Sequence, residues 1–150
     1  MSTQAEDLTV RKSVVVDCSP EHAFETFTAR ISTWWPYETH SPTGERPEAG
    51  VFEPRVGGRV YDRAANGEEH EWASVLVWEP PSRFVLDWHV TPGNPSTQLE
   101  VRFLAEGDRT RVELEHRGWE SYGEDARDTF ASYSSGWDTV LGRFVEGASR

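Results

Sequence analysis

The chain has 150 residues, a length typical of one domain, and its formal net charge of −11 argues against binding to nucleic acid or to an anionic membrane. A single cysteine, Cys18, excludes an intrachain disulfide and a zinc site built from several cysteines, and it fits a reducing cytoplasm. The aromatic fraction of 12% is high for a chain of this size, and large rings both fill small cores and line ligand pockets.

We expect one domain over residues 8–147, preceded by a flexible N-terminus at residues 1–7 and followed by a short tail at residues 148–150. The first seven residues are polar and acidic, and they lack the hydrophobic segment of a signal peptide. No stretch approaches the roughly 20 apolar residues that cross a bilayer. The sequence therefore predicts a cytoplasmic protein with no membrane partner.

The domain opens with a valine-rich strand, predicted over Leu8 to Asp17. The run Ser19-Pro20-Glu21 has the residues of a helix start: an N-cap hydroxyl, a proline for the first turn and an acidic side chain near the positive end of the helix dipole. A second short helix is predicted over Arg30 to Trp35 and ends at Pro36. The segment Tyr37 to Glu48 contains two prolines, one glycine and several polar residues, which indicates a loop.

Alternating apolar and polar residues, separated by turn residues, predict six more strands. Their ranges are Val51–Val56, Arg59–Arg63, Glu71–Trp78, Arg83–Val90, Thr97–Leu104 and Arg109–His116. In the last three strands one face is apolar and the other is mostly charged, so we expect the charged face to meet water. The strand Glu71–Trp78 is apolar on both faces, so alternation does not assign its inward side. Its tryptophans, Trp72 and Trp78, mark either a homodimer surface or a face covered by the N-terminal helices.

The C-terminal segment changes to helical spacing, which predicts a long helix over Glu124 to Glu146. Tyr133, Trp137 and Phe144 lie four and seven residues apart and belong to one apolar stripe. Gly147 follows as a helix stop. This helix is the predicted element with enough apolar length to cover the apolar face of the sheet.

The predicted fold class is therefore α+β. A curved antiparallel sheet wraps around the long C-terminal helix, and two short helices follow the first strand. One helix rarely fills the whole space above a curved sheet, so we expect an apolar cavity between the sheet and the C-terminal helix.

Six short motifs occur in the same order as in a known family. They are Ser19-Pro20-Glu21, Gly57-Gly58, Val77-Trp78-Glu79-Pro80-Pro81, Leu86-Asp87-Trp88, Thr110 to His116 and Gly136 to Leu141. Together they resemble the SRPBCC superfamily (START-like, Bet v 1-like), in the branch of the activator of Hsp90 ATPase. The resemblance covers roughly Leu8 to Val145. It implies a helix-grip fold with a deep hydrophobic pocket, in a family whose members bind lipids, sterols or hormones, carry polyketides through cyclisation, or contact a chaperone.

Eight residues are predicted to line the pocket, because they fall on the inward faces of the predicted elements or at the expected mouth. They are Trp35, Trp88, Phe103, Leu114, His116, Tyr133, Gly136 and Trp137. An indole N–H of Trp88 or Trp137 could serve a ligand acceptor. His116 is the one catalytic candidate, as a general base or a partner for a polar ligand head; the alternative is a core histidine bonded near the Gly118 turn.

Other chemistry lacks support in the sequence. The five histidines show no metal-ligand spacing, no G-x-S-x-G motif occurs, and no glycine-rich loop opens a helix. We therefore predict no metal and no cofactor. The leading hypothesis is the binding of a small, largely hydrophobic ligand. The alternatives are a cyclase- or aromatase-like enzyme that uses His116 or Tyr133 as proton carrier, and a regulator of an Hsp90-type chaperone ATPase.

Overall fold

The computed structural model describes residues 8–40, 47–91 and 93–149. One antiparallel sheet has seven strands in the order β1-β7-β6-β5-β4-β3-β2. The strands are β1 (Val10–Val16), β2 (Ala49–Phe52), β3 (Arg59–Arg63), β4 (Glu69–Glu79), β5 (Arg83–Trp88), β6 (Thr97–Glu106) and β7 (Arg109–Arg117). Strands β2 to β7 follow one another as a meander, and β1 pairs with β7 at the edge.

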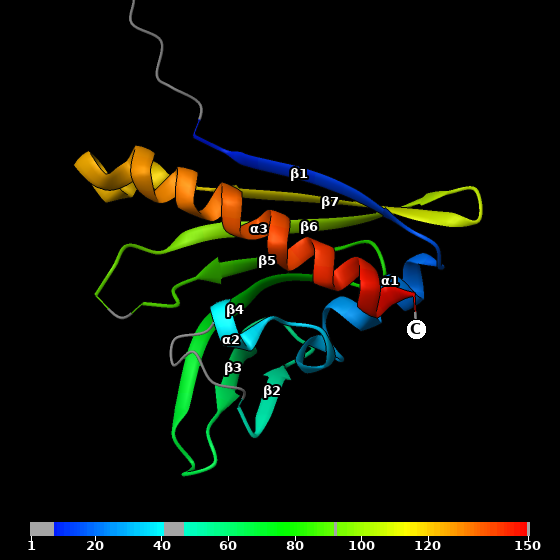
Figure 1. Ribbon diagram of the computed structural model, residues 1–150, viewed down its shortest axis with the longest axis horizontal. Helices are drawn as coiled ribbons and strands as arrows, with labels where there is room; N and C mark the ends of the chain where they lie inside the picture. Colours follow the sequence, from blue (N-terminus) through cyan, green and yellow to red (C-terminus); the bar gives the residue numbers. More distant parts are fainter. Residues whose placement is uncertain (1–7, 41–46, 92, 150) are drawn as a thin grey trace, which may run out of the picture.

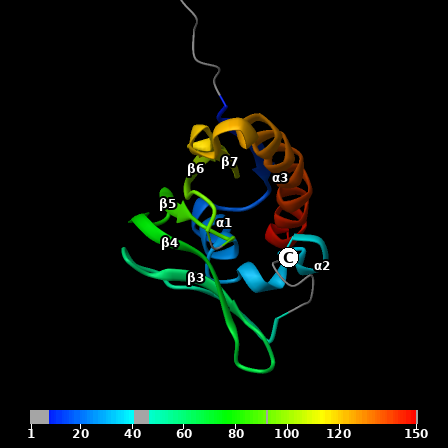
Figure 2. The same ribbon diagram turned by 90° about the vertical axis from the view of Figure 1, so that its left-hand side faces the viewer.

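The helices are α1 (Pro20–Phe27), the 3₁₀ turn η1 (Ile31–Thr33), α2 (Tyr37–His40), the 3₁₀ segment η2 (Trp119–Asp125) and α3 (Ala126–Ala148). Helix α3 runs along the sheet (Figure 1). Figure 2 shows the sheet curling from β7 through β4 to β3, with α3 on the open side and α1 between them. The predicted fold class is confirmed: this is a helix-grip arrangement. Among the described residues, no helix combines the length and the apolarity that crossing a membrane requires.

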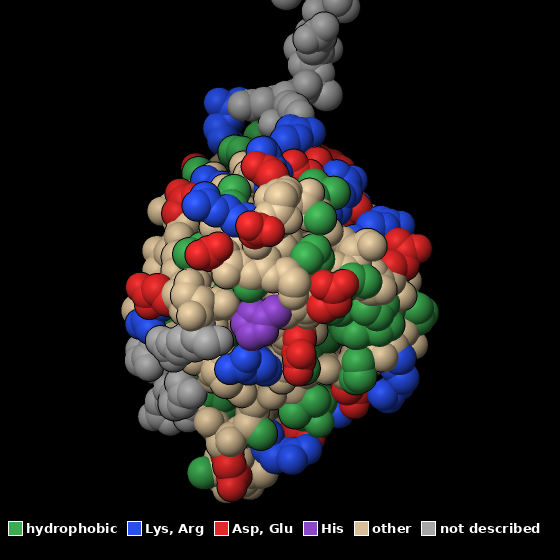
Figure 3. Space-filling model, turned by 90° about the vertical axis from the view of Figure 1, so that its right-hand side faces the viewer, with side chains coloured by type: hydrophobic (Ala, Val, Ile, Leu, Met, Phe, Trp, Pro, Cys, Tyr) green, Lys and Arg blue, Asp and Glu red, His purple; other side chains and the backbone are tan. Residues whose placement is uncertain are grey.

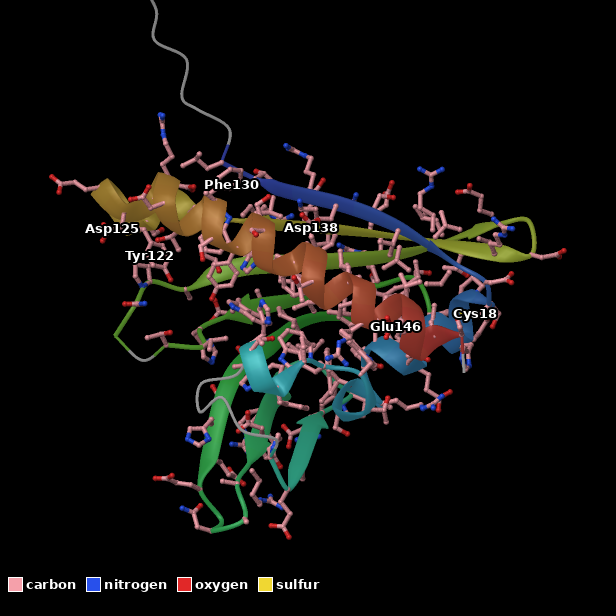
Figure 4. All side chains as sticks on the ribbon, in the orientation of Figure 1. Cys18, Tyr122, Asp125, Phe130, Asp138 and Glu146 are labelled. Atoms are coloured by element: carbon pink, nitrogen blue, oxygen red, sulfur yellow. The ribbon has the colours of Figure 1, made fainter. Side chains whose placement is uncertain are left out.

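Helix α3 presents one apolar stripe to the sheet. Trp137, Val140, Leu141 and Phe144 are all buried, as their spacing predicts. On the other side of the stripe, Asp138 forms an ion pair with Lys12 of β1 at 3.0 Å, and Figure 4 shows Asp138 on the part of α3 that faces this strand. The helix is therefore held to both the centre and the edge of the sheet.

The ends of α3 differ from the prediction by two residues each. Before its start, Gly123 has a φ of 62° and breaks the helical backbone inside η2, three residues ahead of α3. At the end, Gly147 lies inside the helix rather than stopping it, so α3 runs one residue past the expected domain end at residue 147. Residues 1–7, which we expected to be flexible, lie outside the described residues.

Helix α1 begins as predicted, and the segment after it does not follow the prediction. The Ser19 hydroxyl accepts a hydrogen bond from the backbone N–H of His22 at 3.2 Å, and Pro20 opens the helix. The second predicted helix is only the 3₁₀ turn η1. The predicted loop instead contains α2, because the carbonyl oxygen of Pro36 accepts hydrogen bonds from the backbone of the helix. The part of this loop at residues 41–46 lies outside the described residues.

Strand β4 lacks regular alternation because its pairing shifts twice. One irregularity lies opposite Val60 and Tyr61 of β3, and the other lies between Val75 and Val77. Trp72 is thereby buried within its own chain, where its ring lies 4.7 Å from that of Trp35. Trp78 packs against Phe24 of α1 at 5.0 Å. Trp72 is thus buried under the segment that follows β1 and Trp78 is half-buried against it, while the homodimer stays a prediction.

The outer face of the sheet carries a charged cluster around Glu100 of β6. Its carboxylate is nearly buried and forms ion pairs with Arg83, Arg102 and Arg117 at 2.9, 3.0 and 3.1 Å. Burial by itself would raise the pKa of Glu100, but the hydrogen bonds and charges of the three arginines outweigh it and lower that pKa. This cluster ties β5, β6 and β7 together on the side away from α3.

Candidate ligand-binding site

A cavity of about 400 Å³ lies between α3, the strands β4 and β5, and α2. Four tryptophans from four different parts of the chain line it, and we call them the tryptophan wall: Trp35, Trp72, Trp88 and Trp137. The remaining lining residues are Thr39, His40, Val90, Thr91, Ser132, Tyr133, Gly136 and Val140. No carboxylate and no Lys or Arg lines the cavity among the described residues, so it offers aromatic rings, hydroxyl groups and one imidazole.

Each indole N–H of the tryptophan wall donates a hydrogen bond to the protein itself. The bonds run from Trp35 to the His40 carbonyl oxygen (2.8 Å), from Trp72 to Asp62 Oδ2 (3.1 Å), from Trp88 to Tyr133 Oη (3.2 Å) and from Trp137 to His116 Nδ1 (3.0 Å). The expectation that an indole N–H serves a ligand therefore does not fit this geometry. The bonds fix the orientation of each ring, and the wall offers aromatic carbon to the cavity.

The rings of the wall also pack against one another. The centroid separations within the wall range from 4.7 Å for Trp35 and Trp72 to 6.4 Å for Trp35 and Trp88. A flat ligand between two parallel rings would need them about 7 Å apart, twice an ordinary carbon–carbon contact. The indole pairs that pack in this way are too close for such a slot, so we expect a ligand to lie against the wall.

His116 is placed behind the wall and does not line the cavity. Its side chain is fully buried, with ring contacts to Trp88 and Trp137. Because Nδ1 accepts the Trp137 N–H, the ring proton lies on Nε2, which donates to Thr97 Oγ1 at 2.7 Å. Burial, helped by the charge of Arg117, lowers the pKa of His116 to about 3. This neutral, enclosed imidazole corresponds to the core alternative for this residue, although its bonds are to side chains rather than backbone.

Phe103 and Leu114 also lie away from the cavity. Both are buried, and Phe103 packs against Phe24 and Phe27 with ring centroids 5.1 and 6.1 Å apart. The reason is that α1 fills the space over that end of the sheet. The inward position of Phe103 on β6 therefore leads to the core under α1 and not to the open cavity.

The other five predicted residues do line the cavity: Trp35, Trp88, Tyr133, Gly136 and Trp137. Their part in ligand binding stays a prediction. Tyr133 lies one turn before Gly136 on α3 and its hydroxyl accepts the Trp88 N–H. Burial raises the pKa of this phenol, so it keeps its proton at neutral pH.

Trp72 and His40 are the main lining residues that the sequence did not indicate. Trp72 reaches the cavity because of the bulge in β4, which alternation cannot reveal. His40 belongs to α2, where we expected a loop. Its ring lies against α3: the Nε2 atom is 3.5 Å from the point where a β-carbon on Gly136 would lie. A side chain at position 136 would therefore narrow the cavity.

The remaining surface features lie apart from this site. Figure 4 places Cys18 beside α1, at the opposite end of α3 from Tyr122. Figure 3 shows the end of the molecule with the chain's C-terminus, where acidic and basic side chains are interspersed and no patch of one sign gathers. Within the described ranges, no group of three or more histidine, cysteine or acidic side chains is arranged to hold a metal ion.

Residues 17–147 match the family described as activator of Hsp90 ATPase homolog 1-like protein, while no curated protein matches in sequence. The anthrahydroquino-γ-pyrone synthase Txn09 is 33% identical, with 93% of this chain and 96% of that chain covered and a TM-score of 0.61. CalC, a self-sacrificing resistance protein from Micromonospora echinospora, is 29% identical over 95% and 94%, with a TM-score of 0.73. The Aha1 dimer from Colwellia psychrerythraea shares the fold at 14% identity, over 94% and 96%, with a TM-score of 0.68.

Proposed function

The chain belongs to the family of activator of Hsp90 ATPase homolog 1-like proteins, and we propose that it binds a small, flat, largely apolar molecule against the tryptophan wall. The observation that carries this proposal is the wall itself. Its four N–H groups are all bonded to the protein, so it presents aromatic surface and no unpaired indole donor. Aromatic surface of this kind binds other flat rings through dispersion and offset or edge contacts.

The size of the cavity and the nature of the relatives support a ring-containing ligand. A volume of about 400 Å³ falls in the range of roughly 300–1,000 Å³ that is usual for small-molecule sites. Txn09 is named as a synthase of an anthrahydroquinone-γ-pyrone, which is a fused-ring compound, and this chain is 33% identical to it. The likeness to the Aha1 dimer, at 14% identity, concerns the fold, so it supports no chaperone role.

Naphthalene is a suitable probe because it is flat, neutral and free of hydrogen-bonding groups. We expect isothermal titration calorimetry to detect its binding to the wild-type protein. In Gly136→Leu the new side chain extends from α3 into the cavity, beside His40, and should reduce naphthalene affinity at least tenfold, which corresponds to about 1.4 kcal/mol.

Gly142→Leu is the matched control. Gly142 lies on the same helix, is exposed and has no atom within 4 Å of its β-carbon position, so this variant should bind naphthalene as the wild type does. Equal affinities in all three proteins would show that the probe binds elsewhere. Absence of binding to the wild type would contradict the proposed function.

A second candidate is proton-transfer catalysis on the bound molecule, favoured by the 33% identity to a synthase. Of the two proton carriers considered, Tyr133 lines the cavity and His116 is enclosed and neutral. A probe reaction is the exchange of the α-protons of 2-tetralone in D₂O, followed by proton NMR. Catalysis in the cavity predicts faster exchange with the wild type than with Gly136→Leu, whereas equal rates would remove this candidate.

A further inference from the structure

The imidazole of His40 is held in a defined orientation at the cavity. Its backbone carbonyl oxygen accepts the Trp35 N–H, which fixes the end of α2 to the tryptophan wall. Its Nδ1 atom lies 2.7 Å from Thr39 Oγ1, and its Nε2 atom lies beside Gly136. Within the described part of the chain, Nε2 has no hydrogen-bond partner.

The hydroxyl of Thr39 bonds to His40 Nδ1, and the direction of that bond sets which nitrogen of His40 carries the proton. This hydroxyl has one proton, and we assign it to the bond with the Pro36 carbonyl oxygen, 3.4 Å away. The Thr39 oxygen then accepts from His40, so Nδ1 holds the ring proton. The lone pair of Nε2 is left toward the cavity as a hydrogen-bond acceptor.

Tyr133 offers the opposite group from α3. Its oxygen already accepts the Trp88 N–H at 3.2 Å, and no described group accepts its own proton. Because burial keeps the phenol neutral, this proton is free to be donated. Since the indole N–H groups of the wall are all used within the protein, the O–H of Tyr133 is the donor that we assign to the aromatic side of the cavity.

We propose that His40 and Tyr133 form an acceptor–donor pair that selects ligands in which a flat aromatic framework carries both a hydroxyl and a carbonyl group. The ligand hydroxyl donates to His40 Nε2, and the ligand carbonyl oxygen accepts from Tyr133 Oη. This inference rests on the proposed function, because it assumes that the ring system lies against the tryptophan wall. It assigns the specificity to two residues on facing helices.

Four naphthalene probes test the pair by calorimetry: naphthalene, 2-naphthol, 2-methoxynaphthalene and 2-acetylnaphthalene. One hydrogen bond changes affinity by about threefold to tenfold. The wild type should therefore bind 2-naphthol more tightly than 2-methoxynaphthalene, which lacks the proton. His40→Ala should weaken the binding of 2-naphthol by that factor and leave the binding of 2-acetylnaphthalene unchanged. Tyr133→Phe should weaken the binding of 2-acetylnaphthalene by that factor and leave the binding of 2-naphthol unchanged.

Naphthalene is the reference probe: both residues line the cavity and Tyr133→Phe also removes the acceptor of the Trp88 N–H, so the affinity of each polar probe is compared with that of naphthalene in the same variant. Loss of 2-acetylnaphthalene binding in His40→Ala would show that Nε2 donates, which overturns the assignment. Four probes with equal affinity for the wild type would overturn the pair while leaving the proposed function standing. No binding of any probe would overturn both.

Discussion

His116 shows how burial decides the chemistry of one side chain. Its two ring nitrogens bond to Trp137 and Thr97, and the ring is fully enclosed. A protonated His116 would have two N–H donors, so Nδ1 would need an acceptor in place of the Trp137 N–H. Burying its charge away from water would also be unfavourable. The ring stays neutral in the folded protein well above its pKa of about 3, and the residue acts by fixing the orientation of one indole of the wall.

The depressed pKa of His116 makes the free energy of unfolding depend on pH. The folded-state pKa is about 3 and the ordinary value is 6.5, so only the unfolded chain gains this proton as the pH falls below 6.5. The contribution of His116 to the free energy of unfolding is complete above pH 6.5 and is lost as the pH falls toward 3. Near the middle of this range, the free energy of unfolding falls by about 1.4 kcal/mol per pH unit.

His116→Gln tests this dependence, because glutamine can accept from Trp137 and donate to Thr97 without titrating. Urea unfolding of the wild type and the variant between pH 6 and pH 4 measures the free energy of unfolding against pH. Its slope should be smaller in the variant by about 1.4 kcal/mol per pH unit. Identical slopes would mean that His116 is protonated in the folded protein.

Helix α3 contains three glycines in three different surroundings. At Gly142 an added β-carbon meets no atom within 4 Å, and at Gly136 it meets the His40 ring at an ordinary 3.5 Å. At Gly147 it would lie 2.9 Å from the β-carbon of Trp34, which cannot move without its backbone. The same substitution should therefore have opposite effects along one helix.

Alanine at these positions separates helix propensity from packing. Gly142→Ala and Gly136→Ala should each stabilise the protein by up to about 1 kcal/mol, because glycine is a poor helix former. Gly147→Ala should destabilise it, since the close approach to Trp34 outweighs that gain. Thermal and urea unfolding of the three variants measure these changes; a shift of the same sign in all three would be inconsistent with the packing described.

The elements themselves were largely predictable, and the exceptions have local causes. Seven strands and the long helix follow from alternation and helical spacing, because each buries one continuous face. The inward face of β4 could not be assigned because two register shifts break its period, and α2 was not predicted because proline usually ends a helix, whereas Pro36 begins the next turn. Neither the bulge nor the role of the proline can be recognised without the neighbouring strand or helix.

Across the whole molecule, the sequence predicted a cavity but not where it ends. Helix α1 lies between the sheet and α3 (Figure 2), and its Phe24 packs against Phe103, so α1 fills that end of the space under α3. Inward positions on β6 and β7 therefore serve the core, while β4, β5 and α2 supply the cavity. The division depends on contacts between distant segments, such as Trp35 with Trp72, which no local pattern contains.

The seven tryptophans of the chain allow a direct measurement of where a ligand lies. In a two-dimensional ¹H–¹⁵N NMR titration with naphthalene, the indole signals of Trp35, Trp72, Trp88 and Trp137 should shift most. The signal of Trp78, which packs against Phe24 and Phe52 outside the cavity, should change least. Shifts centred on Trp78, or no shifts at saturating naphthalene, would contradict the assignment of the tryptophan wall as the binding surface.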